Sequence, residues 1–309
     1  QWLYFTPSSG SILLCDLHTG SSLTVHGNMD LKSISSQGGA AIEVGPASNV
    51  YVDGNTTLHS IKATAARLYG TSLFKGNVTA ISTAILDTYP GIVASGNNVF
   101  MKNLDITSAP SGFQQVSNPN ASTVVEGNLN VTTTGSAANG VQLDSGTISV
   151  KNNTTITTSG DSANGITISS GSFEGLGTNT IATTGAKANG INSTGGVVAL
   201  GTTASSVPAN TTAVVVNSGT INSKEAAGIV INGGFMNSDL STKTQDVLVS
   251  IGNSGSVTSA GSSTGNASTA IDAYSSGAIT INNSGTVNSK NGTAITAKNS
   301  SNSDINVTN

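Results

Sequence analysis

The chain has few of the residues that carry binding and catalytic chemistry in most proteins. Of its 309 residues, only 8% are charged and 4% are aromatic. The formal net charge is -4, and the 11 Lys and Arg are spread along the chain. They form no basic stripe of the kind that binds phosphate backbones, so we expect no nucleic-acid partner. No apolar run approaches the roughly 18 residues that span a bilayer, so we expect no membrane insertion of this segment.

Cysteine and histidine are also scarce. Cys15 is the single cysteine, which excludes an intramolecular disulfide framework and a thiolate metal cluster. Its place at the end of the apolar stretch Ile12–Cys15 predicts a buried structural thiol. His18, His26 and His59 have no partners at zinc-ligand spacing, and we interpret them as surface or cap residues. We therefore expect neither a metal nor a cofactor.

Gly, Ser, Thr and Asn dominate instead, a composition that by itself is typical of disordered chains. A hydrophobic repeat of roughly 25 residues argues against disorder, because aligned apolar positions predict a packed interior. Its first column pairs two positions six residues apart: Val25/Leu31, Val52/Leu58, Phe74/Ala80, Phe100/Ile106, Val125/Val131, Val150/Ile156, Gly175/Ile181, Val215/Ile221, Ile251/Val257 and Ile281/Val287. Its second column contains Ile42, Leu68, Ile92, Val116, Val141, Ile166, Ile191, Ile229, Ile271 and Ile295. Only Gly175 interrupts the apolar pattern.

These columns predict ten stacked coils, each of which buries its apolar face against its neighbours, as in a solenoid. From Val125 to Val131 the apolar residues alternate with polar ones at period two, so we predict one strand with one face inward. A repeat of this length fits three short strands and three turns per coil. The predicted fold is all-β: a right-handed parallel β-helix of about ten or more coils.

Glycine and asparagine recur at particular places in this pattern. Four Gly-Asn pairs fall in the middle of the predicted strand, where glycine is expected to let the opposite wall of the solenoid approach. They are Gly27-Asn28, Gly54-Asn55, Gly76-Asn77 and Gly127-Asn128. In later coils Asn217, Asn253 and Asn283 take an inward position. Because buried amides need hydrogen-bond partners, we predict a structural amide ladder through these three residues.

The repeat also predicts the domain organisation. Residues 1–23 lack the repeat and begin with an aromatic cluster, so we predict an N-terminal cap followed by a β-helix over 24–309. Wider spacing between the later coils predicts surface loop insertions near 196–213, 234–249 and 260–269. We expect the chain to be an excised, mature part of a longer protein.

An enzyme has to be considered, because parallel β-helices also carry polysaccharide lyases and hydrolases. A glycosidase needs two carboxylates about 5 to 10 Å apart. Asp30 and Asp105 share one predicted outward column, and Asp53 and Glu126 share another, but each pair is three coils apart, about 14 Å at the spacing of paired strands. A lyase needs a carboxylate cluster beside a basic residue, and no Asp-rich motif stands near the single arginine, Arg67. We assign no catalytic residue.

The candidates for ligand binding are tyrosines and basic residues of the first coils. Tyr51, Tyr69 and Tyr89 belong to three consecutive coils. An exposed tyrosine beside Lys62 or Arg67 is suited to stacking on a sugar or a protein partner, and filling of the core or cap is the alternative for each ring. A further outward column mixes charges in a way that solubility alone explains. It contains His26, Asp53, Lys75, Met101, Glu126 and Lys151.

Two later coils share a longer motif. It is Asn217-Ser-Gly-Thr-Ile-Asn-Ser followed by Ala227-Gly-Ile-Val, repeated as Asn283-Ser-Gly-Thr-Val-Asn-Ser followed by Thr293-Ala-Ile-Thr. From about Leu23 to Asn309 the chain resembles the passenger domains of autotransporters of Gram-negative bacteria, especially the AIDA-type adhesins. The resemblance implies export through a C-terminal outer-membrane β-barrel and a place at the bacterial cell surface or in secreted form. It also implies attachment to host glycans or extracellular-matrix proteins, bacterial aggregation and biofilm formation.

The expected function is that of a non-enzymatic surface adhesin whose rod binds a host glycan, a matrix protein, or the same protein on a neighbouring cell. A polysaccharide lyase, hydrolase or phage-type depolymerase on the same scaffold is the main alternative. A structural spacer that presents another domain is a third possibility. A carboxylate cluster exposed in a groove favours the enzyme, whereas an uninterrupted polar face favours the adhesin.

Overall fold

The computed structural model describes residues 15–34, 39–84, 89–116, 118–204, 213–232, 249–260, 268–300 and 303–309. Their strands join into three sheets of eleven, twelve and ten strands, which we call sheets A, B and C. Strand pairing is parallel in all three sheets. The predicted all-β fold with parallel strands is therefore confirmed.

The strands have the following bounds. Sheet A contains β1 Asp16–Leu17, β4 Ile42–Val44, β7 Ala66–Leu68, β10 Ile92–Ala94, β13 Phe113–Gln115, β16 Val141–Leu143, β19 Ile166–Ile168, β22 Ile191–Ser193, β26 Ile229–Asn232, β29 Ile271–Ser275 and β32 Ile295–Asn299. Sheet B contains β2 Ser22–Val25, β5 Asn49–Val52, β8 Thr71–Phe74, β11 Asn97–Phe100, β14 Ser122–Val125, β17 Thr147–Val150, β20 Ser172–Gly175, β23 Gly196–Leu200, β24 Ala213–Asn217, β27 Val249–Asn253, β30 Ile279–Asn283 and β33 Ile305–Thr308. Sheet C contains β3 Met29–Ser33, β6 Thr56–Ser60, β9 Val78–Ser82, β12 Leu104–Ser108, β15 Leu129–Thr133, β18 Thr154–Thr158, β21 Asn179–Ala186, β25 Thr220–Glu225, β28 Ser256–Ser259 and β31 Thr286–Ser289.

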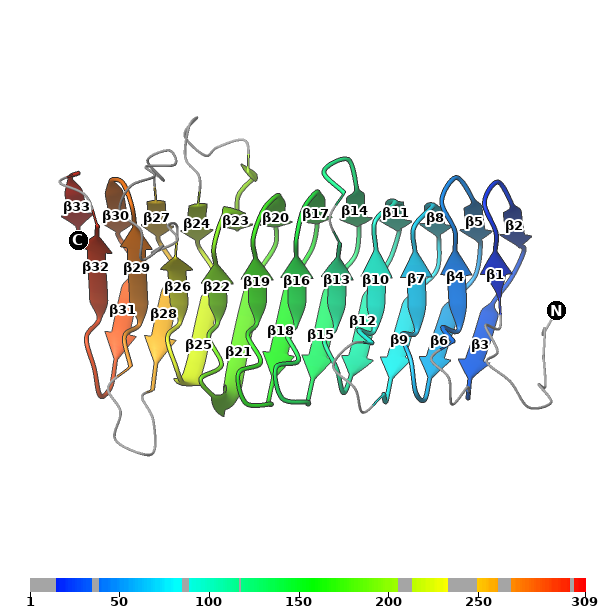
Figure 1. Cartoon of the computed structure of the whole chain (residues 1–309), viewed down its shortest axis with the longest axis horizontal. Coiled ribbons are helices and arrows are strands. Elements are labelled where there is room, and N and C mark those ends of the chain that lie inside the picture. Colours follow the sequence, from blue (N-terminus) through cyan, green and yellow to red (C-terminus); the bar gives the residue numbers. More distant parts are fainter. Residues whose placement is uncertain are drawn as a thin grey trace.

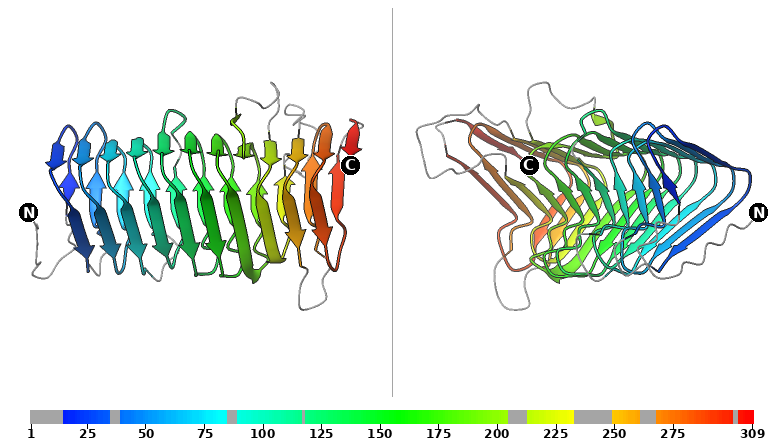
Figure 2. Two further views of the ribbon diagram at one scale, coloured as in Figure 1. Left: turned by 180° about the vertical axis from the view of Figure 1, so that it is seen from behind. Right: turned by 45° about the vertical axis from the view of Figure 1, so that its right-hand side comes forward.

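The chain visits the three sheets in turn and winds into a solenoid of about ten coils. Except around β23, each strand pairs with the strand three places later in the chain, as β3 does with β6 and β6 with β9. The coils follow one another along a single axis, with β1 and β2 at one end and β32 and β33 at the other (Figure 1). A view from behind and a view turned by 45° show the same stack of coils (Figure 2).

The first predicted strand of each coil proved to be two strands. Val125 ends β14 in sheet B and Leu129 begins β15 in sheet C, so the intervening residues 126–128 form a corner. The prediction of one continuous strand was wrong because the alternation of apolar residues passes through the corner without a break. The role predicted for glycine was also wrong. A Cβ on Gly127 would lie 2.4 Å from the backbone carbon of Lys102 in the preceding coil, so the close approach is along the stack.

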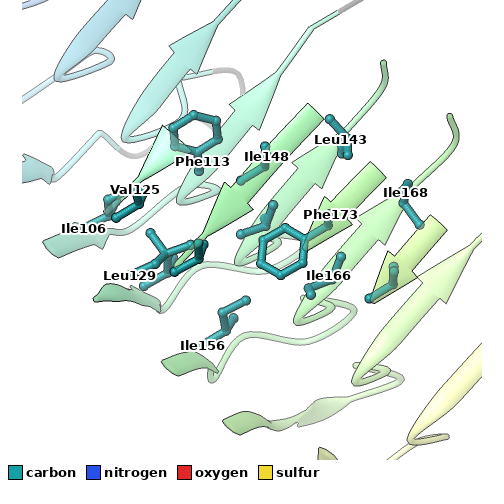
Figure 3. Close-up of a cluster of buried hydrophobic side chains, with 14 of the residues drawn as sticks. Ile106, Phe113, Val125, Leu129, Leu143, Ile148, Ile156, Ile166, Ile168 and Phe173 are labelled. Atoms are coloured by element: carbon teal, nitrogen blue, oxygen red, sulfur yellow. The ribbon is translucent and has the colours of Figure 1, made fainter. Parts of the chain in front are cut away.

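The core runs along the inside of all three sheets, because every second side chain of each strand points inward. Inward residues of adjacent coils lie in register and form a continuous column of aliphatic side chains with occasional phenylalanines (Figure 3). Phe74 and Phe100 are fully buried, and their rings stack with centroids 5.3 Å apart. Burial of each such side chain stabilises the fold by about 1.5–3 kcal/mol.

Two members of the predicted second column were wrong. In sheet A, Ile42 pairs with Ala66 and Ile92 pairs with Phe113, whereas Leu68 was expected in place of Ala66 and Val116 in place of Phe113. Leu68 is still buried, two residues further along β7, and Val116 lies beyond the end of β13. Large aliphatic residues mark the column less reliably than the pairing does, since an alanine and a phenylalanine occupy it on either side of Ile92.

The interruption of the apolar column at Gly175 is explained by the side chain of Asn179. The Asn179 side chain is buried and donates to the carbonyl oxygens of Gly175 at 2.8 Å and of Gly177 at 2.7 Å. A Cβ on residue 175 would lie 2.0 Å from Asn179 Oδ1. Glycine at this position therefore makes the space that the buried amide occupies.

Two polar columns accompany the core. Asn217 Nδ2 donates to Asn253 Oδ1 at 2.9 Å, and Asn253 Nδ2 donates to Asn283 Oδ1 at 2.7 Å, so the predicted amide ladder is present. Asn309 extends it, because Asn283 Nδ2 donates to its Oδ1 at 2.5 Å. The other column was not predicted: the last inward position of each sheet C strand is Ser or Thr. Several of these hydroxyls donate to carbonyl oxygens of the adjoining turn, as Thr133 Oγ1 does to Ala138 at 2.6 Å and Thr183 Oγ1 to Ala188 at 2.7 Å.

The solenoid begins earlier in the chain than the predicted end of the cap at residue 23. Residues 16–23 belong to the first coil, because β1 pairs with β4 and β2 pairs with β5. Residues 1–14 lie outside the described residues. Cys15 is half-buried against the core, and burial, followed by the nearby Asp16 carboxylate, raises the pKa of its thiol.

The first predicted insertion also changes. Gly196–Leu200 was expected in a loop but forms β23, which lies between β20 and β24 in sheet B. In this coil the chain enters sheet B twice, while β22 pairs directly with β26 in sheet A and β21 with β25 in sheet C. Sheet B is longer by one strand, or about 4.8 Å. Most of the predicted insertions near 234–249 and 260–269 lie outside the described residues.

Candidate functional site

The outer face of sheet C presents an extended polar surface. Its outward side chains form two rows in register from β12 to β28. We call these residues the polar face: Asp105, Thr107, Asn130, Thr132, Thr155, Thr157, Thr180, Ala182, Thr220, Asn222, Ser256 and Thr258. Every one except Asp105 is uncharged, and every one except Ala182 carries a hydrogen-bonding group.

The regularity of the polar face follows from the core beneath it. Between β12 and β18 each residue pairs with its equivalent in the next strand without a shift, so outward threonines repeat at the strand spacing of about 4.8 Å. Asn130 Nδ2 donates to Asp105 Oδ1 at 2.7 Å. The one carboxylate of the two rows therefore has a hydrogen-bond partner within the polar face. The register shifts only further along, between Thr183 and Ala186 where β21 meets β25.

Chemically, the polar face presents hydroxyl and amide groups that both donate and accept hydrogen bonds, with threonine methyl groups between them. Such a surface suits a long partner with repeated polar groups, because many weak contacts along a rod add up to useful avidity. Outside the polar face, sheet C carries ionisable side chains at Asp30 and Lys32 on β3, at His59 on β6, and at Lys224 and Glu225 at the end of β25. Burial and then Lys32 lower the pKa of His59, while Asp30 acts in the opposite direction.

Among the predicted ligand-binding residues, Tyr51 is part of a charged cluster at the corner of sheet B. His26 Nδ1 lies 2.8 Å from Asp53 Oδ2, and Lys75 Nζ lies 3.2 Å from Asp53 Oδ1. The Lys75 ammonium also lies 4.7 Å from the centre of the Tyr51 ring. Outward charges that solubility alone was expected to explain thus form a connected cluster.

The cluster holds Asp53 in its charged form. Hydrogen bonding from Tyr51, then from His26 and Lys75, lowers the pKa of Asp53 to about 2. Hydrogen bonding to Tyr51 and Asp53 raises the pKa of Lys75. Both charges are therefore present throughout the neutral range. Because the ammonium covers one side of the Tyr51 ring, that side is already occupied within the chain.

Arg67 and Tyr69 lie on sheet A rather than beside Tyr51. Arg67 points outward from β7, and its Nη1 lies 3.1 Å from Glu43 Oε2 on the preceding strand. Tyr69 follows β7 and is half-buried, and burial is the main reason that the pKa of its hydroxyl is raised. The Tyr69 side chain is therefore only partly accessible to a ligand.

Lys62 and Tyr89 lie between sheets C and A. Lys62 is exposed in the turn after β6, and Tyr89 is half-buried in the segment that leads from β9 to β10. The five candidates are thus divided between sheet A, sheet B and the turns from C to A. Although these residues are close in sequence, they do not come together in one aromatic and basic site.

The predicted geometry of the carboxylates is reproduced by the strand register. Asp30 pairs with Thr57, Thr57 with Thr79, and Thr79 with Asp105, which separates the two carboxylates by three strand spacings. Within the described ranges, no group of three or more His, Cys, Asp or Glu side chains is placed to hold a metal ion. A pocket of about 480 Å³ is lined by Asn283, Gly285, Thr286, Val287, Ala294, Ile295 and Asn309 at the C-terminal coils.

Sheet A has an amide cluster that the sequence did not suggest. Gln142 Nε2 donates to Asp144 Oδ1 at 3.1 Å, and Gln114 Nε2, one coil earlier, lies 3.4 Å from Asp144 Oδ2. Gln114 and Gln142 pair in register, which is what brings both amides to one carboxylate. Both carboxylate oxygens of Asp144 therefore have an amide partner within the chain.

The comparisons with known proteins give no relative. No family model, curated protein or solved structure matches the chain. Within the described residues, no helix has the length and apolar character needed to cross a membrane.

Proposed function

We propose that the chain is a non-enzymatic adhesive rod, displayed at a bacterial cell surface or secreted in the manner of an autotransporter passenger. Its polar face binds a host glycan or an extracellular-matrix protein, or pairs with the same face on a neighbouring cell. The observation that carries the proposal is the double row of polar, mostly threonine and asparagine side chains on sheet C, in which only Ala182 lacks a hydrogen-bonding group. The resemblance of the repeated Asn-Ser-Gly-Thr motif to AIDA-type passengers supports the same function.

The physical basis is multivalency rather than one deep pocket. Exposed hydroxyl and amide groups gain little from any single hydrogen bond in water, since each exchanges one partner for another. A rigid array pays no further ordering cost for each added contact, so a partner that spans several coils gains avidity along the rod. Saccharide chains and extended polar β-strands both present repeated hydroxyl or amide groups over such lengths.

A display experiment tests the proposal. The chain is displayed on non-adherent bacteria, which are scored for retention on immobilised glycans and matrix proteins and for clumping. Thr132 and Thr157 are paired outward residues of β15 and β18, and both are changed to Lys. The two bulky like charges should disrupt the array, and we expect retention or clumping to fall at least about tenfold, equivalent to about 1.4 kcal/mol.

A matched control places the same charges elsewhere. Ser169 and Thr194 are exposed and follow β19 and β22 on sheet A, and changing both to Lys should leave adhesion unchanged. Equal loss in both double variants would contradict a role for the polar face. Absence of adhesion in the unchanged chain, together with shortening of added polysaccharide, would replace the adhesin with a polysaccharide lyase or hydrolase. Absence of both effects would favour a spacer.

A further inference from the structure

The turns from sheet C to sheet A contain a second asparagine ladder, in which each asparagine is followed by glycine. The backbone N–H of Asn164 donates to Asn139 Oδ1 at 3.0 Å, and that of Asn189 donates to Asn164 Oδ1 at 2.9 Å. The backbone N–H of Ala227 donates to Asn189 Oδ1 at 3.2 Å. Each side-chain carbonyl of this turn ladder is thus held by the next coil.

The glycine that follows each of these asparagines is held as well. The N–H of Gly140 donates to the carbonyl oxygen of Asn164 at 2.9 Å, and the N–H of Gly165 donates to that of Asn189 at 2.9 Å. The N–H of Gly190 donates to the carbonyl oxygen of Ala227 at 3.1 Å. Both groups that take part in the characteristic reaction of an Asn-Gly step, the side-chain carbonyl and the following amide nitrogen, are therefore engaged.

Asn291-Gly292 has the same dipeptide sequence but lies outside this ladder. It stands in the turn between β31 and β32, and both residues are exposed. Within the described part of the chain, neither the Asn291 side chain nor the Gly292 N–H makes a hydrogen bond. The residues that precede Ile295 in the position of the ladder are Thr293 and Ala294, so the asparagine is displaced from the column.

We propose that Asn291 is a site of spontaneous deamidation, a covalent modification from which the fold protects the three asparagines of the turn ladder. The Gly292 amide nitrogen loses its proton to water or hydroxide and attacks Asn291 Cγ. A bond forms between this nitrogen and Cγ, the bond from Cγ to the side-chain nitrogen breaks, and ammonia leaves. Water then opens the five-membered imide at either carbonyl, which gives aspartate or isoaspartate.

The difference between the sites is geometric. Attack requires the glycine nitrogen to approach Cγ of the preceding side chain, and effective intramolecular reactions need the reacting atoms held near contact distance. In the ladder, this approach would break the hydrogen bonds of both groups to the next coil. At Asn291 no such bond opposes it. The product places a carboxylate next to Lys290, and the isoaspartate form adds one carbon to the backbone of this turn.

The chain offers matched controls for a test by mass spectrometry. Cleavage after lysine and arginine separates these four steps into the peptides 103–151, 152–187, 188–224 and 291–298, each with one Asn-Gly. The fifth Asn-Gly of the sequence, Asn232-Gly233, falls in a separate peptide, 225–243. The folded chain is incubated in mildly alkaline buffer and digested, and conversion of amide to acid is followed at each step. We expect Asn291 to react at least about tenfold faster than Asn139, Asn164 or Asn189, since each lost hydrogen bond opposes the reaction.

A denatured sample separates the effect of the fold from that of the sequence. In denaturant the four steps should react at rates within about threefold of one another, because the ladder is gone. The N291Q variant should lose the reaction in peptide 291–298, since a longer side chain requires a larger ring. Equal rates at all four steps in the folded chain, or faster reaction within the ladder, would overturn the proposal. Neither result bears on adhesion by the polar face, which is measured separately.

Discussion

Asn253 is the central residue of the interior amide ladder. It accepts from Asn217 and donates to Asn283, and both bonds lie inside the solenoid. An amide there is stable only because its neighbours above and below are also amides. The same pairing rule makes the ladder sensitive to the loss of a single member.

Replacing Asn253 with Ala should destabilise the chain by about 2–4 kcal/mol, because a buried donor on Asn217 and a buried acceptor on Asn283 each lose a partner. Denaturant unfolding measures the change. Asn288, which points outward from β31, provides the control, and its change to Ala should cost less than about 0.5 kcal/mol. Equal costs would mean that the ladder contributes nothing beyond the local strand.

Asp53 predicts a dependence of stability on pH. Its folded-state pKa of about 2 lies below the ordinary value of 3.8, so its contribution is present above about pH 4 and is lost as pH falls through 2. The D53N variant should have a lower Tm than the unchanged chain at neutral pH, and the gap should close at pH 2. A gap that stays constant from pH 7 to pH 2 would contradict the assigned role of the carboxylate.

At the scale of elements, each coil is a set of three strands that gains its stability from the coils on either side. The corners depend on close approach along the stack: a Cβ on Gly76 would lie 2.2 Å from the carbonyl oxygen of Gly54. In the corner between sheets B and C, Asn55 and Asn77 also link successive coils, since the Asn77 N–H donates to Asn55 Oδ1 at 3.0 Å. The turns are thus bonded to one another as the strands are.

The extra strand β23 predicts a tolerated deletion. Gly196 pairs with Ala213, so removing residues 196–212 would place β24 against β20 in the register that β23 now has. The shortened chain should stay soluble and keep its β-sheet circular dichroism signal and a cooperative thermal transition, because each coil would then enter sheet B once. Aggregation or loss of the β signal would show that β23 is needed for stacking beyond it.

At the scale of the whole molecule, the proposed adhesion should depend on length more than on charge. Only Asp105 is charged within the polar face, and it is bonded to Asn130. Retention of displayed cells should therefore change by less than about threefold between 0.1 M and 1 M salt, where the screening length falls from about 10 Å to about 3 Å. A loss of more than about tenfold would point to the charged corner around Asp53 instead.

The repeat was visible in the sequence because each coil applies the same constraint to equivalent residues. Inward aliphatic residues and inward asparagines are set by burial, which acts on residue type directly, so their columns and the ladder could be predicted. The inward Ser and Thr that end the sheet C strands carried a signal of the same kind, two residues after each core aliphatic. They were missed because serine and threonine are common everywhere in this chain.

The candidate site was less predictable for a different reason. Tyr51, Arg67 and Tyr69 are close in sequence, yet β6 of sheet C and the corners on either side of it separate the first from the other two. Which outward residues share a face depends on where each strand ends, and small corner residues such as Gly127 do not interrupt the alternation that marks a strand. The polar face can be recognised only when the position of the corner between sheets B and C is known.

By itself, the sequence determined an all-β parallel solenoid, its approximate number of coils and the interior amide ladder, because a buried column must repeat the same chemistry in every coil. Tertiary structure decided the corners, the true partners of Ile42 and Ile92, the second passage of the chain through sheet B and the contrast between held and free Asn-Gly steps. These features depend on pairing between coils, and a hydrogen bond from a backbone N–H to the next coil leaves little trace in the identity of the residue that makes it.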